Sequence, residues 1–212
     1  MPKTPFIPAL RFHPLTRLYD PIVRLTTRET VVKGALVDGI GPAGPGRVLD
    51  LGSGTGTLLA MLRARYPKAA LVGLDADPRI VRQAQRKVGA AVPIVVADAT
   101  RPPFAPESFD RVVSSLLFHH LTRPQKRAAL EAVRSLLRPG GELHLADWGA
   151  PQDRLMRFAY LGVQVLDGFE TTGDHAAGKL PTFAREAGFR EVTVTRRERT
   201  PLGTMSILRA VA

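Results

Sequence analysis

The residues best suited to chemistry lie in the segment 48–56, which has the sequence VLDLGSGTG. Three glycines at alternate positions, Gly52, Gly54 and Gly56, follow a short apolar run and precede a stretch with helical spacing of apolar residues. Glycines in such a turn let the backbone approach a ligand closely, and free N–H groups at the start of a helix can bind anionic or carboxylate atoms. The segment therefore predicts a ligand-binding turn between a strand and a helix.

An acidic residue, Asp75, ends the next apolar run and lies 21 residues after Gly54. In nucleoside-binding sheets a carboxylate at about this distance accepts hydrogen bonds from ribose hydroxyls. A strand, a glycine turn, a helix and an acid thus occur in the order that a nucleoside site requires. Together they predict a nucleoside-bearing ligand.

The glycine pattern does not match two common nucleotide fingerprints. The dinucleotide fingerprint needs a glycine at its sixth position, which is Thr57 when counted from Gly52 and Leu59 when counted from Gly54. No Gly-Lys-Ser/Thr sequence follows, so the phosphate-loop pattern is absent as well. The charge of Asp50 would repel a pyrophosphate but attract a cation, which favours a ligand that carries an ammonium or a sulfonium.

Alternating strands and helices are needed to bring these residues together. Short apolar runs typical of buried strands occupy residues 47–51, 70–74, 92–97, 109–115 and 142–147, and helical patterns occupy residues 55–66, 78–88 and 124–137. After a predicted helix at 182–187, two alternating segments follow without a helix between them, at 191–197 and 204–211. We predict an α/β fold, with a Rossmann-like, seven-stranded, mostly parallel sheet, helices on both faces and a C-terminal antiparallel hairpin.

A dense Pro/Gly segment at 39–46 separates an N-terminal piece from the rest of the chain. We predict one domain over residues 1–212. Its expected parts are an N-terminal helical cap at 1–40, a ligand-binding core at 46–148, a helical insertion or lid at 149–181, and a C-terminal helix and hairpin at 182–212.

Composition and charge narrow the classes of function. The chain contains no Cys, which excludes disulfides, thiolate metal sites and a Cys nucleophile. Its net charge of +11 is scattered, and its densest basic cluster, at 196–199, includes Glu198, so nucleic acid is disfavoured as a partner. No apolar stretch is long enough to cross a bilayer and the Pro-rich N-terminus has no signal-peptide core, so we expect a cytoplasmic protein without a membrane span.

The segment VLDLGSGTG resembles motif I of the class I S-adenosylmethionine-dependent methyltransferases. Four further segments follow in the order found in that family: LVGLDAD at 71–77, VVADAT at 95–100, FDRVVSSLLFHHL at 109–121 and LRPGGELHLADW at 137–148. The resemblance covers roughly residues 14 to 212. The N-terminal segment with Tyr19 and Asp20 is similar to that of the small-molecule branch, which includes quinone-biosynthesis-type methyltransferases.

The resemblance implies that S-adenosyl-L-methionine is the cofactor. Asp50 and the backbone of Gly52, Ser53 and Gly54 would hold its methionine moiety. The other residues implied to contact it are Asp75 at the ribose hydroxyls, Ala76 beneath the adenine, Asp98 and Ala99 at the adenine amino group, and Ser115 or Leu116 near the sulfonium.

The acceptor is expected to bind near the loop after the fourth strand. Transfer would be an in-line displacement, for which the protein mainly supplies proximity and orientation. A general base is needed only for a hydroxyl or an acidic carbon, and His119 and His120 are the candidates; a hydrogen bond that holds the loop is the alternative for each. We expect no more than one of these adjacent residues to face the acceptor. No metal site is predicted, because His119, Asp147 and His175 lack a recognised ligand spacing.

Three aromatic residues, Tyr19, Trp148 and Tyr160, are candidates for acceptor binding. Trp148 ends the fifth predicted strand on the same side of the sheet as the histidine loop, and its alternative role is to pack under the predicted helix at 156–169. The short, moderately apolar segments outside the sheet suit a lid over a small molecule.

The resemblance favours methyl transfer to a small-molecule acceptor. The alternatives are a nucleic-acid or protein acceptor with the same cofactor, and a non-enzymatic nucleoside-binding protein on the same fold. Amino-methylating nucleic-acid enzymes carry an Asn/Asp-Pro-Pro-aromatic motif where this chain has Ser114-Ser115-Leu116-Leu117, and carbon-5 methylation of pyrimidines uses a Cys that this chain lacks. The acceptor and the type of atom methylated stay open.

Overall fold

The computed structural model describes residues 28–41, 44 and 46–212. Most of the predicted N-terminal cap, including the candidate Tyr19, lies outside the described residues. Within them, no helix has the length and apolar character needed to cross a membrane.

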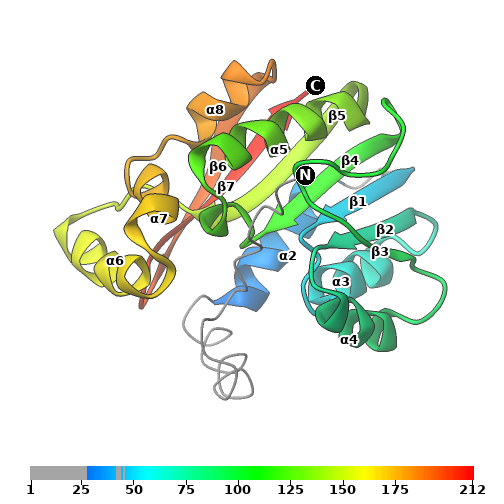
Figure 1. Ribbon diagram of the computed structural model, residues 1–212, viewed down its shortest axis with the longest axis horizontal. Coiled ribbons are helices and arrows are strands. Elements are labelled where there is room, and N and C mark those ends of the chain that lie inside the picture. The colour runs from blue at the N-terminus through cyan, green and yellow to red at the C-terminus, as the bar shows by residue number, and fades with distance from the viewer. Residues whose placement is uncertain (1–27, 42–43, 45) are drawn as a thin grey trace, which may run out of the picture.

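Seven strands form one sheet in the order β3-β2-β1-β4-β5-β7-β6 (Figure 1). The strands are β1 (Arg47–Leu51), β2 (Ala70–Asp75), β3 (Ile94–Val96), β4 (Phe109–Ser115), β5 (Leu137–Trp148), β6 (Arg190–Thr200) and β7 (Gly203–Val211). The first five are parallel, whereas β7 runs antiparallel to both β5 and β6. This mixed sheet confirms the predicted fold class.

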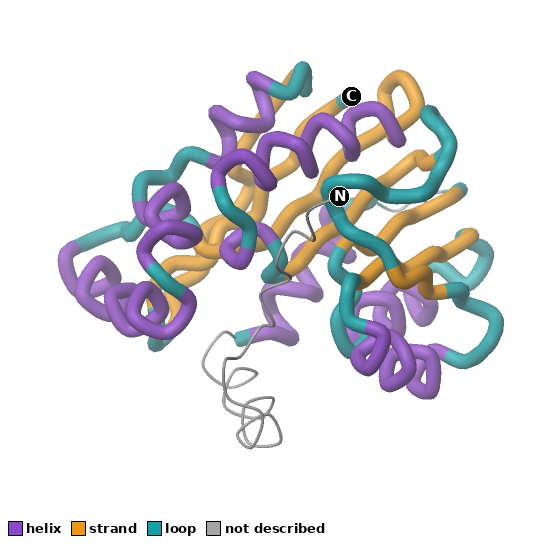
Figure 2. Tube along the Cα trace, in the orientation of Figure 1, coloured by secondary structure: helices purple, strands orange, loops and turns teal. Residues whose placement is uncertain are grey.

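Helices pack on both faces of the sheet (Figure 2). They are α2 (Glu29–Gly39), α3 (Thr57–Arg65), α4 (Pro78–Val88), α5 (Arg123–Leu136), α6 (Arg154–Asp167), α7 (Phe169–Ala176) and α8 (Leu180–Glu186), with a short 3-10 helix, η2 (Phe118–His120), after β4. Two apolar clusters form the core because successive strand residues point to opposite faces. Leu49 and Leu51 of β1 join α5 and α8 in one cluster, and Val48 joins α2, α3 and α6 in the other.

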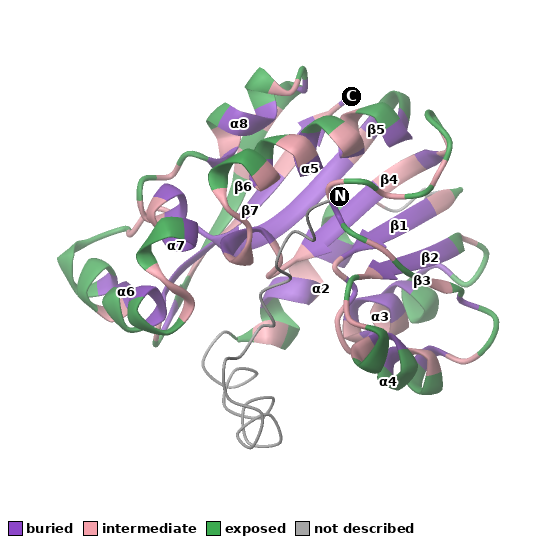
Figure 3. Cartoon of the chain, in the orientation of Figure 1, coloured by how far each residue is buried: buried purple, intermediate pink, exposed green. Residues whose placement is uncertain are grey.

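The buried strands lie between partly exposed helices (Figure 3). Since β1, β2, β4 and β5 are parallel, their carboxyl ends meet at one edge of the sheet. That edge brings together the glycine turn after β1, Asp75 at the end of β2, and Trp148 at the end of β5. It also carries the loop after β4, which contains both candidate histidines.

The fifth strand is longer than its apolar pattern predicts. It begins at Leu137 rather than at residue 142, because Leu137 already pairs with Phe109 of β4. The register then shifts before Arg111, and Gly141 accepts a hydrogen bond from the backbone of Ala212 at 2.8 Å. The Pro-Gly-Gly segment at 139–141, between the predicted helix at 124–137 and the predicted strand at 142–147, is therefore part of an irregular extension of the strand.

Candidate functional site

The glycine turn combines two closely packed positions with one open position. Gly52, Gly54 and Gly56 have φ values of 75°, 52° and 76°, a left-handed conformation that favours glycine. A Cβ added to Gly52 would lie 3.0 Å from Leu117, and one added to Gly56 would lie 3.1 Å from the Cβ of Ala84. A Cβ added to Gly54 would have no atom within 4 Å. Gly54 thus borders open space among the described residues.

Two polar side chains at this turn are buried without a partner. Among the described residues, neither Oδ2 of Asp50 nor Oγ of Ser53 has a hydrogen-bond partner. Burial raises the pKa of Asp50 to about 7, with Lys33 opposing the shift and Asp75 adding to it. Leaving buried polar atoms unpaired costs free energy, which a polar or cationic ligand would recover. The donor set therefore fits a methionine moiety with its ammonium group.

The carboxylate of Asp75 is held in place by the turn itself. Its Oδ2 accepts a hydrogen bond from the N–H of Gly54 at 2.9 Å, and its Oδ1 accepts one from the N–H of Asp77 at 3.0 Å. The side chain stays partly exposed, and the neighbouring Ala76 is exposed. Asp77 caps α4 by accepting from the N–H of Arg79 at 2.7 Å. The structure thus joins Asp75 to the glycine turn.

The adenine-side candidates differ in their surroundings. Asp98 is exposed, and its Oδ1 accepts hydrogen bonds from the N–H and the hydroxyl of Thr100, each at 2.8 Å. Ala99 is buried in the apolar core. The hydrogen bonds of Asp98 are therefore those of a residue that stabilises a turn. The methyl group of Ala99 packs in the apolar core.

The end of β4 lies directly against the glycine turn. Ser114 donates a hydrogen bond to the carbonyl of Leu51 at 2.8 Å, and Leu117 fills the space beside Gly52. The hydroxyl of Ser115 is buried without a partner among the described residues. Leu116 has a φ of 58°, a conformation that is strained for a bulky aliphatic residue and that recurs at functional sites.

Asp147 at the end of β5 organises the histidine loop. Its Oδ2 accepts from the N–H groups of Phe118 at 2.7 Å and His119 at 3.3 Å, and its Oδ1 accepts from the N–H of Trp148 at 2.7 Å. Nδ1 of His119 donates to the same Oδ1 at 2.8 Å. Although burial acts to raise the pKa of Asp147, the charges of His119 and His175 and these hydrogen bonds lower it overall. The sequence marks Asp147 as an acid at a strand end but carries no signal of this hydrogen bonding.

The two candidate histidines lie side by side. Their ring centroids are 3.9 Å apart. That no more than one of them faces the acceptor stays a prediction. His119 is buried and His120 is partly exposed. Burial lowers the pKa of His119, but the charge of Asp147 outweighs it and raises the pKa above its ordinary value. Burial and the neighbouring His119 lower the pKa of His120 to about 3.

Asp167, at the end of α6, joins this group from another part of the chain. Its Oδ2 lies 3.8 Å from Nε2 of His119, and burial raises its pKa. His175 of α7 also approaches, with its Nδ1 donating to the carbonyl of Trp148 at 2.8 Å and lying 3.8 Å from Oδ1 of Asp147. The set His119, Asp147 and His175 is therefore assembled in space, although no sequence spacing marks it. Nothing in the local sequence indicates Asp167.

Trp148 and Tyr160 are both buried in the core between the sheet and α6. Their ring centroids are 5.5 Å apart, and the hydroxyl of Tyr160 has no partner among the described residues. The alternative role of Trp148, packing under the helix, is thus what the structure shows. Trp148 also borders a cavity of about 200 Å³ on the side of α8, together with Leu145, His175, Leu180, Val194 and Leu208.

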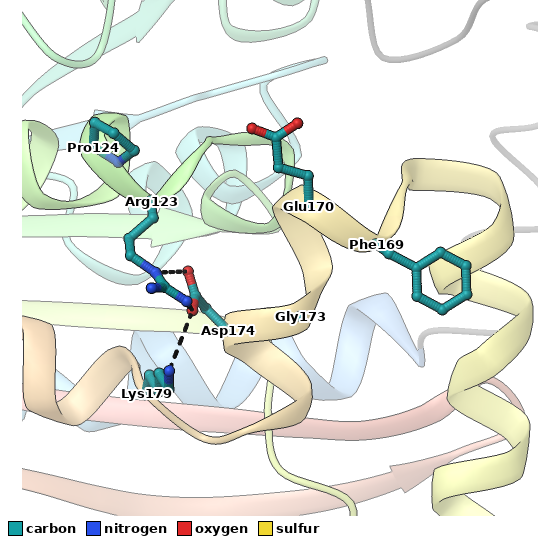
Figure 4. A pocket seen from close by; sticks show the side chains of 7 residues that line it. All are labelled: Arg123, Pro124, Phe169, Glu170, Gly173, Asp174 and Lys179. Atoms are coloured by element: carbon teal, nitrogen blue, oxygen red, sulfur yellow. Dashed lines mark hydrogen bonds and ion pairs between the residues drawn. The ribbon is translucent and has the colours of Figure 1, made fainter.

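A larger hollow, of about 540 Å³, lies between the start of α5 and α7 (Figure 4). Arg123 and Lys179 flank Asp174 there, and a nitrogen of Arg123 lies 2.6 Å from its Oδ1. None of the lining residues belongs to the glycine turn or to the ends of β1 and β2. This hollow is separate from the nucleoside site.

Comparisons with known proteins identify relatives of this chain. A family model described as a methyltransferase domain matches residues 48–141. A malonyl-(acyl-carrier protein) O-methyltransferase of Laribacter hongkongensis is 35% identical over 150 residues, which cover 66% of this chain and 47% of that protein. A demethylmenaquinone methyltransferase of Thermus thermophilus is 35% identical over 146 residues, or 68% of this chain and 63% of that protein. The chain therefore spans about half to two thirds of the length of these relatives.

A solved structure supports the fold. The crystal structure of an S-adenosylmethionine-dependent methyltransferase from Aquifex aeolicus superposes with a TM-score of 0.66, covering 98% of this chain and 99% of that chain. Its sequence identity of 21% limits this likeness to the fold.

Proposed function

From the premise that this chain belongs to the class I S-adenosylmethionine-dependent methyltransferases, we propose that it transfers a methyl group to a small-molecule acceptor by in-line displacement. One observation carries the proposal: among the described residues, buried oxygens of Asp50 and Ser53 have no hydrogen-bond partner at the open glycine turn, directly beside an anchored Asp75. A cofactor with an ammonium, a carboxylate and a ribose can bind all of these groups at once.

The residues of the turn divide the binding between them. Asp50 holds the ammonium of the methionine moiety, while the hydroxyl of Ser53 and the backbone of Gly52 and Gly54 hold its polar atoms. Asp75 takes the ribose, because each of its oxygens has one backbone donor and keeps capacity for another. Ala76, Asp98 and Ala99 remain proposed contacts of the adenine.

When bound, the cofactor supplies a methyl carbon on a sulfonium, and the carbon–sulfur bond breaks as the acceptor bonds to that carbon. Ser115 and Leu116 line this point, next to Leu117 and the glycine turn. His119 and His120 lie on the acceptor side, where Asp147 fixes the orientation of His119. We assign this pair to the acceptor side, where one of the two histidines acts on the acceptor's proton if it must lose one.

A small acceptor suits the surroundings better than a nucleic acid. Part of the basic side chains behind the net charge of +11 are already paired. Eight arginines of the described residues form ion pairs with acids. Trp148 and Tyr160 are buried in the core next to the histidine loop, so neither aromatic ring presents a surface to the acceptor. An apolar or aromatic acceptor remains our proposal, and a cytoplasmic location stays a prediction.

Transfer of an isotopically labelled methyl group from S-adenosylmethionine tests the proposal. The acceptors are a panel of small quinols and phenols, total RNA, and a cell protein extract. We expect label in the small molecules, its loss in Asp75→Ala, and its retention in Glu186→Ala, which removes an exposed acid on α8. Label found only in RNA or protein would refute the small-molecule acceptor. Cofactor binding without any transfer would favour the non-enzymatic alternative.

A further inference from the structure

We propose that His119, His120 and Asp167 form a binding site for a first-row divalent metal ion such as Zn²⁺, at the acceptor side of the sheet edge. One ligand atom from each of these three residues lies within 4.8 Å of the others. Nε2 of His119 and Oδ2 of Asp167 are 3.8 Å apart. Two ligands at about 2.1 Å from a tetrahedral Zn²⁺ lie about 3.4 Å apart, so this pair is close to the required separation.

The third ligand needs only a small rearrangement. The rings of His119 and His120 already lie side by side, with centroids 3.9 Å apart. The separations of up to 4.8 Å would have to shorten by no more than about 1.4 Å to reach the distance that a tetrahedral Zn²⁺ requires. His120 and Asp167 are partly exposed, which gives an ion a path from solvent.

The surroundings of His119 match those of a metal-binding imidazole. Such a histidine commonly donates its other ring N–H to a carboxylate, which fixes the ring and its tautomer. Asp147 accepts this hydrogen bond from Nδ1 at 2.8 Å and is itself fixed by three backbone donors. Nε2, directed toward Asp167, is thereby the ring atom left for an ion.

The donor set also restricts the kind of ion. Two imidazoles and one carboxylate suit Zn²⁺ and other first-row divalent ions, whereas Mg²⁺ and Ca²⁺ prefer oxygen ligands alone. Three protein ligands leave at least one position open, as in catalytic zinc sites. Tyr160 adds a buried hydroxyl without a partner among the described residues, close enough to Asp167 and Asp147 for their charges to affect it.

The proposed binding of the ion is argued from this geometry, whereas the role of the ion rests on the function proposed above. The open position would take an oxygen of the acceptor next to the cofactor methyl group. The two histidines would then act on the acceptor through the ion, and His119 Nε2 would bind the metal rather than a proton. This arrangement favours acceptors with a hydroxyl or a carbonyl at the methylated end.

Calorimetric titration of the tag-free, EDTA-treated full chain with ZnCl₂ tests the site, with MgCl₂ as the control ion. We expect one Zn²⁺ per chain and no Mg²⁺ binding. His120→Gln and Asp167→Asn should each weaken Zn²⁺ binding at least tenfold, whereas Glu170→Gln, an exposed acid at the start of α7, should not. Circular dichroism of each metal-free variant shows whether it folds.

Absence of Zn²⁺ binding by the folded chain would overturn the proposal. Binding that persists unchanged in both folded variants would also overturn it, since the ion would then lie elsewhere. A parallel titration with S-adenosylhomocysteine separates this failure from failure of the proposed function. Cofactor binding without Zn²⁺ binding refutes the metal site alone, and Zn²⁺ binding without cofactor binding refutes the methyltransferase proposal alone.

Discussion

At the scale of single residues, the glycines of the turn differ in whether they pack against a neighbour or face open space. Gly52 and Gly54 have the same left-handed conformation, but only Gly52 lies against another side chain. Asp50 and Ser53 are buried beside them, each with a side-chain oxygen that has no hydrogen-bond partner in the part of the chain that the structure describes. Substitutions at these residues should therefore change the stability of the fold and the affinity for the ligand to different extents.

The charge of Asp50 should make cofactor binding depend on pH. Its pKa of about 7 means that the buried carboxyl is largely protonated at pH 6 and largely ionised at pH 7.5. Binding of a cationic ammonium needs the ionised form, so affinity for S-adenosylhomocysteine should rise about five- to tenfold between these pH values. Calorimetry at both pH values measures this, and Asp50→Asn should bind weakly with little pH dependence. An equally steep rise in that variant would assign the effect to another group.

The two neighbouring glycines should fail in different ways. Gly52→Ala places a methyl group 3.0 Å from Leu117 in a strained conformation, so we expect a loss of about 2–4 kcal/mol of unfolding free energy. Gly54→Ala meets no neighbour and should lose about 1–2 kcal/mol while weakening cofactor binding. Urea unfolding and calorimetry measure both effects. Equal loss of stability in the two variants would contradict the difference in packing.

At the scale of elements, one carboxylate connects β5 to the loop after β4. Asp147 receives hydrogen bonds from three backbone N–H groups and from His119. The sequence shows an acid at a strand end, but its partners in the loop, Phe118 and His119, are 29 and 28 residues away and depend on which strands become neighbours. A contact of that kind follows from the fold and not from local spacing.

Asp147→Asn should therefore weaken the fold strongly. An amide presents donors to groups that are themselves donors, so we expect about 3 kcal/mol lower unfolding free energy in urea. The matched variant Asp153→Asn changes the exposed cap of α6, which accepts from the N–H of Met156 at 2.9 Å, and should lose less than about 1 kcal/mol. Similar losses in both variants would show that Asp147 is no more than a local cap.

The strand and helix pattern was largely predictable because parallel strands are short apolar runs, and helices show their own spacing. Residues 78–88 and 109–115 form α4 and β4 as predicted. The start of β5 at Leu137 was not predictable, because pairing with Phe109 and Ala212 overrides the local signal of Pro and Gly. The short helix η2 and the division of α6 from α7 also went unpredicted.

At the scale of the whole molecule, the parallel strands gather distant residues at one edge. Asp50, Gly54 and Asp75 could be proposed from the sequence, since each lies near the end of a strand or in the turn after one. Asp167 was not found, because α6 brings it to His119 from outside the core motifs. Trp148 and Tyr160 were assigned to the acceptor from residue type, and their burial in the core could not be inferred without the packing of α6.

The most direct test of the account is a calorimetric titration of the full chain with S-adenosylhomocysteine, with NADH as the control ligand. We predict micromolar binding of the sulfur nucleoside and none of NADH, at least tenfold weaker binding in Asp75→Ala, and unchanged binding in Glu186→Ala. Absence of binding by the folded wild-type chain would contradict the account. Binding unaffected by Asp75→Ala would contradict the site.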